Sequence, residues 1–306
     1  MDREPLAYLN GDFRPQREAS LALNDAGFVT GATVTDLCRT FRHRLFRLAD
    51  HLRRFRQSCD LARVPQPHSD DELAALAERL VVHNAGLLPA EHDLALVMFA
   101  TPGAIGYYLG HPGGPGDAPP TFGMHTFPLP FARYVHLFRE GARLVTPQVR
   151  QVPPAVVDPR IKQRSRLHWW LADREVHAVA PGASALLLDD AGCVTETAAA
   201  NFLIVRQGAV LSPPRSSVLN GISLLVTEEI CRDLGIPFRE QPLPLAECLS
   251  ADEAFLTSTP YGIAGVRELN GVALPWPGPL YRRLLAAWSD RAGLDIEQQV
   301  FAHATT

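Results

Sequence analysis

The chain has almost no lysine: its 306 residues contain 28 arginines and one lysine, Lys162. An arginine side chain stays protonated at any relevant pH, so it cannot act as a nucleophile. A lysine amine can lose its proton when it is desolvated, attack a carbonyl and form an imine. One explanation for the single lysine is chance retention in an arginine-rich chain. The other is that the chemistry of this protein requires an amine at residue 162.

Other absences narrow the class of protein. The formal net charge is only −4, which argues against general binding to nucleic acid or to a membrane surface. No apolar run reaches the roughly 18 residues that a membrane-spanning helix needs, and the first residues contain no signal-peptide core. The five cysteines are scattered, odd in number and without metal-ligand spacing, so we expect reduced thiols in a cytoplasmic protein and no metal site.

Apolar patterns predict helices and strands that alternate along the chain. Apolar residues recur at helical spacing in residues 47–64 and in residues 71–86, where Gly86 ends the pattern. Residues 94–103 have the continuous apolar character of a buried strand. Residues 183–213 read as a series of strands separated by short turns, and helices are expected after residues 221 and 278. This interleaving indicates an α/β or α+β fold.

The length of the chain fits two domains. Residues 110–120, GHPGGPGDAPP, are too rich in glycine and proline to form a helix or a central strand. We interpret them as an interdomain loop, or at least as a long surface loop. The predicted domains are residues 1–118 and residues 119–306.

If Lys162 forms an imine, its commonest cofactor partner is pyridoxal phosphate (PLP), which makes three demands on a protein. The ring nitrogen must stay protonated to act as an electron sink, and this requires a carboxylate beside it. The phosphate requires backbone N–H groups at a helix N-terminus and an arginine. The aldehyde requires the lysine.

The sequence offers a candidate for each demand. Glu196 lies at a strand end among small residues that would let a flat ring approach, although it could also be an ordinary exposed charge. The turn LNGIS, residues 219–223, opens a helix and carries the Ser223 hydroxyl, although Asn-Gly is often only a turn. A second hydroxyl cluster, LTSTP, occupies residues 256–260 and could be a loop cap. Arg54 could supply positive charge, although an arginine on a helix is usually solvated.

The order and spacing of these elements resemble those of the class IV aminotransferases, the fold-type IV PLP enzymes. That group includes branched-chain aminotransferases, D-amino-acid aminotransferases and aminodeoxychorismate lyases. The resemblance runs from about Tyr8 to Trp276 and is most specific from Gly182 to Ser223. The segments that carry it are YLNGDFRP, DAGFVTGATVTDLCRTF, RLFRLADHLRRF, IKQRSRL, GASALLLDDAGCVTETAAANFLIV, VLNGIS, LGIPFRE and ADEAFLTSTP.

The resemblance implies a small N-terminal α/β domain, a larger C-terminal domain that carries the lysine, and a cofactor in the cleft. It also implies a homodimer in which a loop of one subunit reaches the site of the other. By resemblance, Lys162 is the Schiff-base lysine and Glu196 is the partner of the ring nitrogen. The other cofactor-binding residues that it implies are Arg54, Leu219, Gly221, Ile222, Ser223 and Thr259.

Departures from the family pattern affect the expected substrate. Pro260 has no N–H where branched-chain enzymes use a backbone donor for the substrate carboxylate, and Asp36 replaces their glutamate. Arg39, with Arg164 or Arg166, could bind the carboxylate instead, because a guanidinium can bind a carboxylate through two hydrogen bonds. Two alternatives stay open: Asp36 and Arg39 pair with each other, or the amine donor lacks an α-carboxylate.

The resemblance implies a transaminase that moves an amino group from an amino acid, or a related primary amine, to a 2-oxo acid. Lys162 would first form the imine and then act as the general base. The alternative within the family is an aminodeoxychorismate lyase, which would release pyruvate. An alternative of another class is a binding module that keeps the fold without catalysis. The donor, the acceptor and the L or D preference stay open at this level.

Overall fold

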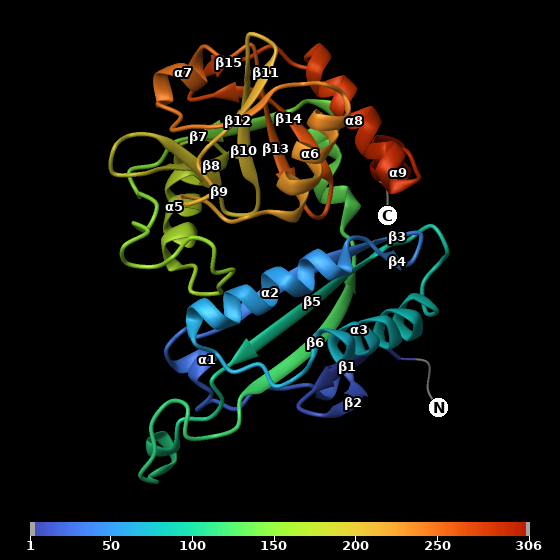
Figure 1. The fold of residues 1–306 in the computed structure, drawn as a ribbon, viewed down its shortest axis with the longest axis vertical. Helices are drawn as coiled ribbons and strands as arrows, with labels where there is room; N and C mark the ends of the chain where they lie inside the picture. The colour runs from blue at the N-terminus through green and yellow to red at the C-terminus, as the bar shows by residue number, and fades with distance from the viewer. Residues whose placement is uncertain (1–3, 304–306) are drawn as a thin grey trace. The chain divides into compact units, whose positions relative to one another are not determined.

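The chain folds into two compact units in the computed structural model, which describes residues 4–303 (Figure 1). The first unit runs to Leu129 and also includes Ile161–Ser165, and the second contains Pro130–Arg160 and the residues from Arg166 onward. The boundary thus lies later than the predicted division between residues 118 and 119. Lys162 packs with the first unit, whereas the resemblance implies that the C-terminal domain carries it.

The first unit is built on an antiparallel sheet with the strand order β2-β1-β6-β5-β3-β4. The strands are β1 (Leu6–Leu9), β2 (Asp12–Pro15), β3 (Val34–Phe41), β4 (Arg44–Leu45), β5 (Leu94–Thr101) and β6 (Thr121–Pro128). β5 and β6 pair along their whole length, from Leu94 opposite Pro128 to Thr101 opposite Thr121. The Gly/Pro-rich residues 110–120 therefore connect two strands of one sheet, so the interdomain interpretation of this loop is wrong.

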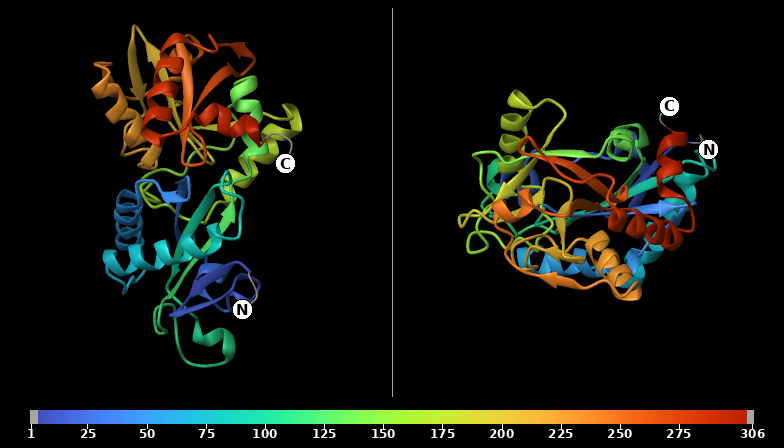
Figure 2. Two further views of the ribbon diagram at one scale, coloured as in Figure 1. Left: turned by 90° about the vertical axis from the view of Figure 1, so that its right-hand side faces the viewer. Right: turned by 90° about the horizontal axis from the view of Figure 1, so that it is seen from above.

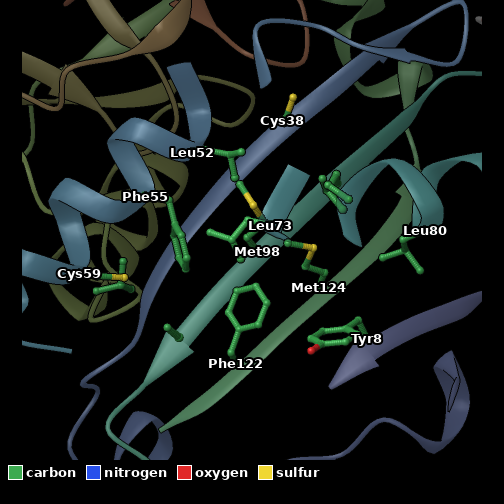
Figure 3. Close-up of a cluster of buried hydrophobic side chains, with 14 of the residues drawn as sticks. Tyr8, Cys38, Leu52, Phe55, Cys59, Leu73, Leu80, Met98, Phe122 and Met124 are labelled. Atoms are coloured by element: carbon green, nitrogen blue, oxygen red, sulfur yellow. The ribbon is translucent and has the colours of Figure 1, made fainter. Parts of the chain in front are cut away.

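Helices α2 (Leu48–Ala62) and α3 (Asp70–Ala85) pack on one face of this sheet (Figures 1 and 2). Figure 3 shows side chains of both helices, among them Phe55 and Leu73, against Met98 and Phe122 of the sheet. The two helices predicted at residues 47–64 and 71–86 are confirmed. The unit also contains α1 (Ala26–Val29) and the short 3-10 helices η1 (Gln16–Glu18) and η2 (Gly106–Leu109).

The second unit contains a sheet that closes on itself. Its strands are β7 (Ala142–Val145), β8 (Ser184–Leu188), β9 (Val194–Thr197), β10 (Asn201–Arg206), β11 (Ala209–Ser212), β12 (Phe238–Glu240), β13 (Glu253–Ser258), β14 (Gly262–Leu269) and β15 (Val272–Ala273). The order is β12-β11-β10-β13-β14-β7-β8-β9, and β9 also pairs with β10. The six strands from β10 through β13, β14, β7 and β8 to β9 thus form a ring, which closes where Glu196 lies opposite Asn201.

Helices surround the sheet of the second unit. They are α4 (Val135–Arg139), α5 (Leu167–Val179), α6 (Ile222–Asp233), α7 (Leu245–Leu249), α8 (Pro279–Ala292) and α9 (Ile296–Ala302), with η3 (Phe131–Tyr134). α6 and α8 are joined by a buried hydrogen bond in which Trp288 Nε1 donates to Thr227 Oγ1 at 3.0 Å. The mixture of helices and strands in both units confirms the predicted class. Within residues 4–303, no helix is long and apolar enough to cross a membrane.

Candidate functional site

The backbone of Lys162 is held at two points within the first unit. Its N–H donates to Ser58 Oγ of α2 at 3.1 Å, and its carbonyl accepts from the backbone N–H of Thr35 at 2.8 Å. The next residue, Gln163, forms an antiparallel bridge with Val34 of β3. The segment that carries the lysine therefore lies along the start of β3 and against α2, which fixes the point from which its side chain extends.

Arg54 is placed by the same helix and strand. It lies one turn before Ser58, so the two residues share a face of α2. Its Nε and Nη2 donate to the two carboxylate oxygens of Asp36, each at 2.8 Å, in a bidentate ion pair. Arg54 is only 6% exposed and Asp36 is fully buried, so the alternative of a solvated helix arginine is wrong.

His51 completes this buried cluster, because its Nδ1 lies 2.7 Å from Asp36 Oδ1. Burial alone would raise the pKa of the Asp36 carboxyl, but Arg54 and His51 together hold that pKa well below its usual range. Burial lowers the pKa of His51 more than Asp36 raises it, so the imidazole is neutral near pH 7. Asp36, which the sequence suggested as a substrate-binding residue, instead orients Arg54 and stays charged.

Arg39 faces the other side of β3, because residues three apart in a strand point to opposite faces. The residue is only 1% exposed, and its Nη2 atom lies 3.4 Å from Asp93 Oδ2. Its guanidinium carbon lies 3.8 Å from the centre of the Phe41 ring. Asp36 and Arg39 thus find different partners rather than each other. These contacts give Arg39 a structural role within the first unit and do not favour it as a receptor for a substrate carboxylate.

Glu196 is buried in the second unit, so the alternative of an exposed strand-end charge is wrong. Its Oε2 accepts from Asn201 Nδ2 at 3.1 Å, and its Oε1 accepts from the backbone N–H of Leu219 at 3.1 Å. Hydrogen bonds from N–H donors favour the ionised form of a carboxylate. The carboxylate of Glu196 is thus held in place by two N–H donors from the start of β10 and from the turn before α6.

The turn that contains Leu219 leads directly into α6. Gly221 is the N-cap residue of this helix, and Ile222 and Ser223 are its first two residues. Within the described part of the chain, no side chain caps this helix end and its first turn contains no acidic residue. The N–H groups of a helix N-terminus and the buried Ser223 hydroxyl suit an anion such as a phosphate.

The second hydroxyl cluster lies near Glu196 through the pairing of β10 with β13. Asn201 lies opposite Thr257, and Ser258 Oγ donates to the carbonyl of Ala199 at 2.6 Å. Thr259 and Pro260 follow immediately, half-buried in the turn after β13. The second unit therefore gathers the carboxylate, the start of α6 and this hydroxyl-bearing turn.

Arg166 reaches the same region. Its Nη2 donates to the carbonyl of Ala198, in the turn between β9 and β10. Arg164, by contrast, belongs to the first unit, where burial lowers its pKa and its backbone N–H donates to the carbonyl of Thr33 at 2.9 Å. Arg166 thus contacts the turn that follows Glu196.

The residues that sequence reasoning missed are those that hold the predicted ones. Ser58 and His51 stand four residues after and three residues before Arg54 on α2, a helical spacing that could have indicated them. Asn201 stands five residues after Glu196, across a tight turn between two predicted strands. A hairpin register aligned on that turn would have placed the two side chains opposite each other.

These residues fit pyridoxal phosphate by the chemistry of their donors. The chain supplies one primary amine on a fixed backbone, one buried carboxylate that accepts from two N–H donors, and a buried arginine whose orientation is set by Asp36. It also supplies a helix N-terminus without a side-chain cap and a buried hydroxyl, Thr257 Oγ1, that has no hydrogen-bond partner among residues 4–303. An imine-forming amine, a ring-nitrogen partner and a phosphate site are the three features that this cofactor needs.

Comparisons with known proteins agree with this chemistry. The family model of class IV aminotransferases matches residues 33–269. A Methanocaldococcus jannaschii protein, provisionally named a branched-chain-amino-acid aminotransferase, is 31% identical over 267 residues, which cover 86% of this chain and 88% of that protein. D-alanine aminotransferase of Staphylococcus aureus is 28% identical over 293 residues, covering 90% and 94% of the two chains.

Solved structures show the same fold. The branched-chain amino acid aminotransferase of Escherichia coli has a TM-score of 0.85 at 22% identity, with 94% of each chain covered. The T.th. branched-chain amino acid aminotransferase, solved with N-(5'-phosphopyridoxyl)-L-glutamate, has a TM-score of 0.82 at 24% identity, with 95% of each chain covered.

Proposed function

Because the chain belongs to the class IV aminotransferase family, we propose that it uses pyridoxal phosphate to transfer an amino group from an amino acid, or a related primary amine, to a 2-oxo acid. The observation that carries this proposal is the position of Lys162. The only lysine of the chain is held through its backbone by β3 and α2, which also carry Asp36 and Arg54. The names of the relatives favour transamination over the lyase alternative.

In this proposal different residues of the chain bind different parts of one cofactor. Lys162 would hold the aldehyde end of the cofactor through its amine, and Glu196 would hold the ring nitrogen. Phosphate contacts come from Arg54, from the start of α6, where Leu219, Gly221, Ile222 and Ser223 lie, and from Thr259. A guanidinium that is already oriented by Asp36 loses little further conformational freedom when it binds a phosphate.

When bound, PLP supplies a cationic ring that withdraws electrons from the α-carbon of the substrate. Glu196 would keep the ring nitrogen protonated, because hydrogen bonds from Asn201 and from the N–H of Leu219 favour the ionised form of its carboxylate. Lys162 would hold the cofactor through its amine. With that amine free and neutral, its Nζ atom would remove the proton from the substrate α-carbon, which would make Lys162 both the covalent anchor and the general base.

We propose that Arg166, rather than Arg39, binds the substrate carboxylate. Pro260 offers no backbone donor, and a guanidinium with five N–H donors can bind a carboxylate while one of its nitrogens contacts Ala198. A homodimer, as the resemblance implies, is also part of this proposal. Its mass in solution can be measured by light scattering.

The test is a panel of amino donors offered to the PLP-loaded protein with 2-oxoglutarate and with pyruvate as acceptors. We expect amino transfer to at least one acceptor and no pyruvate release from aminodeoxychorismate in the absence of an acceptor. Lys162→Arg keeps the positive charge but cannot form an imine, so it should abolish transfer as completely as Lys162→Ala. The control is Arg53→Ala, which removes an exposed cation beside Arg54 on α2. It should retain activity. Pyruvate release without an acceptor would overturn the transaminase assignment.

A further inference from the structure

Asn201 lies where the ring of strands in the second unit closes. It is the first residue of β10, directly opposite Glu196 of β9, and this is the one register pair between the two strands in the described residues. Residues directly opposite each other in an antiparallel pair project to the same face of the sheet. The amide of Asn201 accordingly donates to Glu196 Oε2 at 3.1 Å.

The same amide also binds the turn before α6. Asn201 Nδ2 donates to the carbonyl of Leu219 at 2.9 Å, while the backbone N–H of Leu219 donates to Glu196 Oε1 at 3.1 Å. Both hydrogens of the amide and both oxygens of the carboxylate are thereby used. Three hydrogen bonds form a closed circuit through Asn201, Glu196 and Leu219, so the plane of the carboxylate is fixed relative to the turn.

Gly221 fits this arrangement because it has no side chain. A Cβ atom at residue 221 would overlap Asn201 Oδ1, so the amide occupies the space beside the N-cap of α6. The backbone N–H of Gly221 donates to the same Leu219 carbonyl at 2.8 Å. The Asn201 side chain thus contacts the carboxylate on one side and the residues that start α6 on the other.

We propose that Asn201 is a positioning residue that sets the distance and orientation of Glu196 relative to the N-terminus of α6. This inference rests on the proposed function, in which Glu196 binds the ring nitrogen of PLP and the start of α6 binds its phosphate. The ring and the phosphate are separated by a short covalent linkage, so one cofactor molecule can satisfy both only if the two protein groups keep a matching separation. Asn201, which is 4% exposed, touches both groups and holds that separation.

The experiment compares the binding of PLP with that of pyridoxal, which lacks the phosphate, to the full-length protein. Both compounds form an imine with Lys162, so binding can be followed by the visible absorbance of the lysine-bound form. Asn201→Ala should lower the advantage of PLP over pyridoxal by about ten-fold, because the ring and phosphate contacts can no longer be made together. If Asn201 only stabilises the fold, both affinities fall by the same factor and the advantage is unchanged, and that result would overturn the inference.

A second variant and a control keep the test decisive. Asn201→Leu keeps a side chain of similar size but removes both amide N–H donors, so it should lower the same ratio even if Asn201→Ala folds poorly. Asn84→Ala removes another buried asparagine, one that makes three hydrogen bonds at 2.8 Å in the first unit, and should leave the ratio within about two-fold. If the unaltered protein binds neither compound, the proposed function fails. If it binds PLP normally and both variants keep the ratio, only the role of Asn201 fails.

Discussion

Arg53 and Arg54 are neighbours on α2, and the structure predicts opposite consequences for their removal. Arg54 is buried and binds both oxygens of the fully buried Asp36, whereas the side chain of Arg53 is 73% exposed and pairs with Asp50 at the surface. Arg54→Ala leaves the Asp36 carboxylate buried without its main partner, which typically costs about 3–5 kcal/mol of the free energy of unfolding. Arg53→Ala breaks an exposed pair that typically contributes about 0–1 kcal/mol.

The pH dependence of this difference gives a sharper test. In the unaltered protein Arg54 and His51 hold the folded-state pKa of Asp36 below its unfolded value, so the stability from this carboxylate is lost as the pH falls toward the folded pKa. In Arg54→Ala, burial dominates and raises the pKa of Asp36, so protonation relieves the unpaired charge. The deficit of Arg54→Ala relative to the unaltered protein should therefore shrink as the pH is lowered through the carboxyl range.

The assay must separate the two units, because multi-domain proteins need not unfold in one step. Hydrogen exchange measured on peptides from β3 and α2 reports the first unit. All four tryptophans lie beyond residue 165, so their fluorescence reports the second unit and serves as an internal control. Equal losses of protection for Arg54→Ala and Arg53→Ala, or a deficit that grows as the pH falls, would refute the reasoning.

Three further predictions concern stability and thiol chemistry. Glu253→Gln should lower the free energy of unfolding by about 1–2 kcal/mol, measured by thermal melts. The Glu253 carboxylate accepts from the backbone N–H groups of Leu280 and Tyr281 at the start of α8, at 2.8 and 2.7 Å, so an unchanged melting midpoint would show that it does not cap this helix. Ser69→Ala should cost about 1 kcal/mol in urea unfolding, since Ser69 forms the capping box of α3, and a neutral result would show that the box does not contribute. In a titration of native thiols the half-buried Cys193 should react first, because burial raises the pKa of all five thiols and raises it to about 12 for Cys59, Cys231 and Cys248; fast reaction of several thiols would contradict this.

Elements with strong local patterns could be predicted from the sequence. The helices at residues 47–64 and 71–86 follow an apolar period, and the second ends at Gly86 as predicted. The strands between residues 183 and 213 are bounded by turn residues whose conformations are local. Lys162 could be singled out because its chemistry differs from that of every other cation in the chain.

Features that depend on distant pairing could not be predicted. The parallel pairing of β7 with β8 and β14 joins segments far apart in sequence, and no local pattern encodes it. The partner of Arg54 depends on how α2 lies across β3, so Asp36 could be read equally well as a substrate contact. In the sequence, Arg39 and Asp36 are equally good candidates for a substrate contact. The structure places them on opposite faces of β3, where Arg39 pairs with Asp93.

The measurement that tests the central claim most directly is the location of the covalent bond to the cofactor. The PLP-loaded protein is reduced with borohydride, digested and mapped by mass spectrometry. The account predicts a single phosphopyridoxyl group on the peptide that contains Lys162, and none in Lys162→Arg. Because Lys162 is the only lysine of the sequence, Lys162→Arg removes its only ε-amino group. Label on a peptide that does not contain residue 162, or equal label in Lys162→Arg, would contradict the assignment of Lys162 as the cofactor-binding lysine.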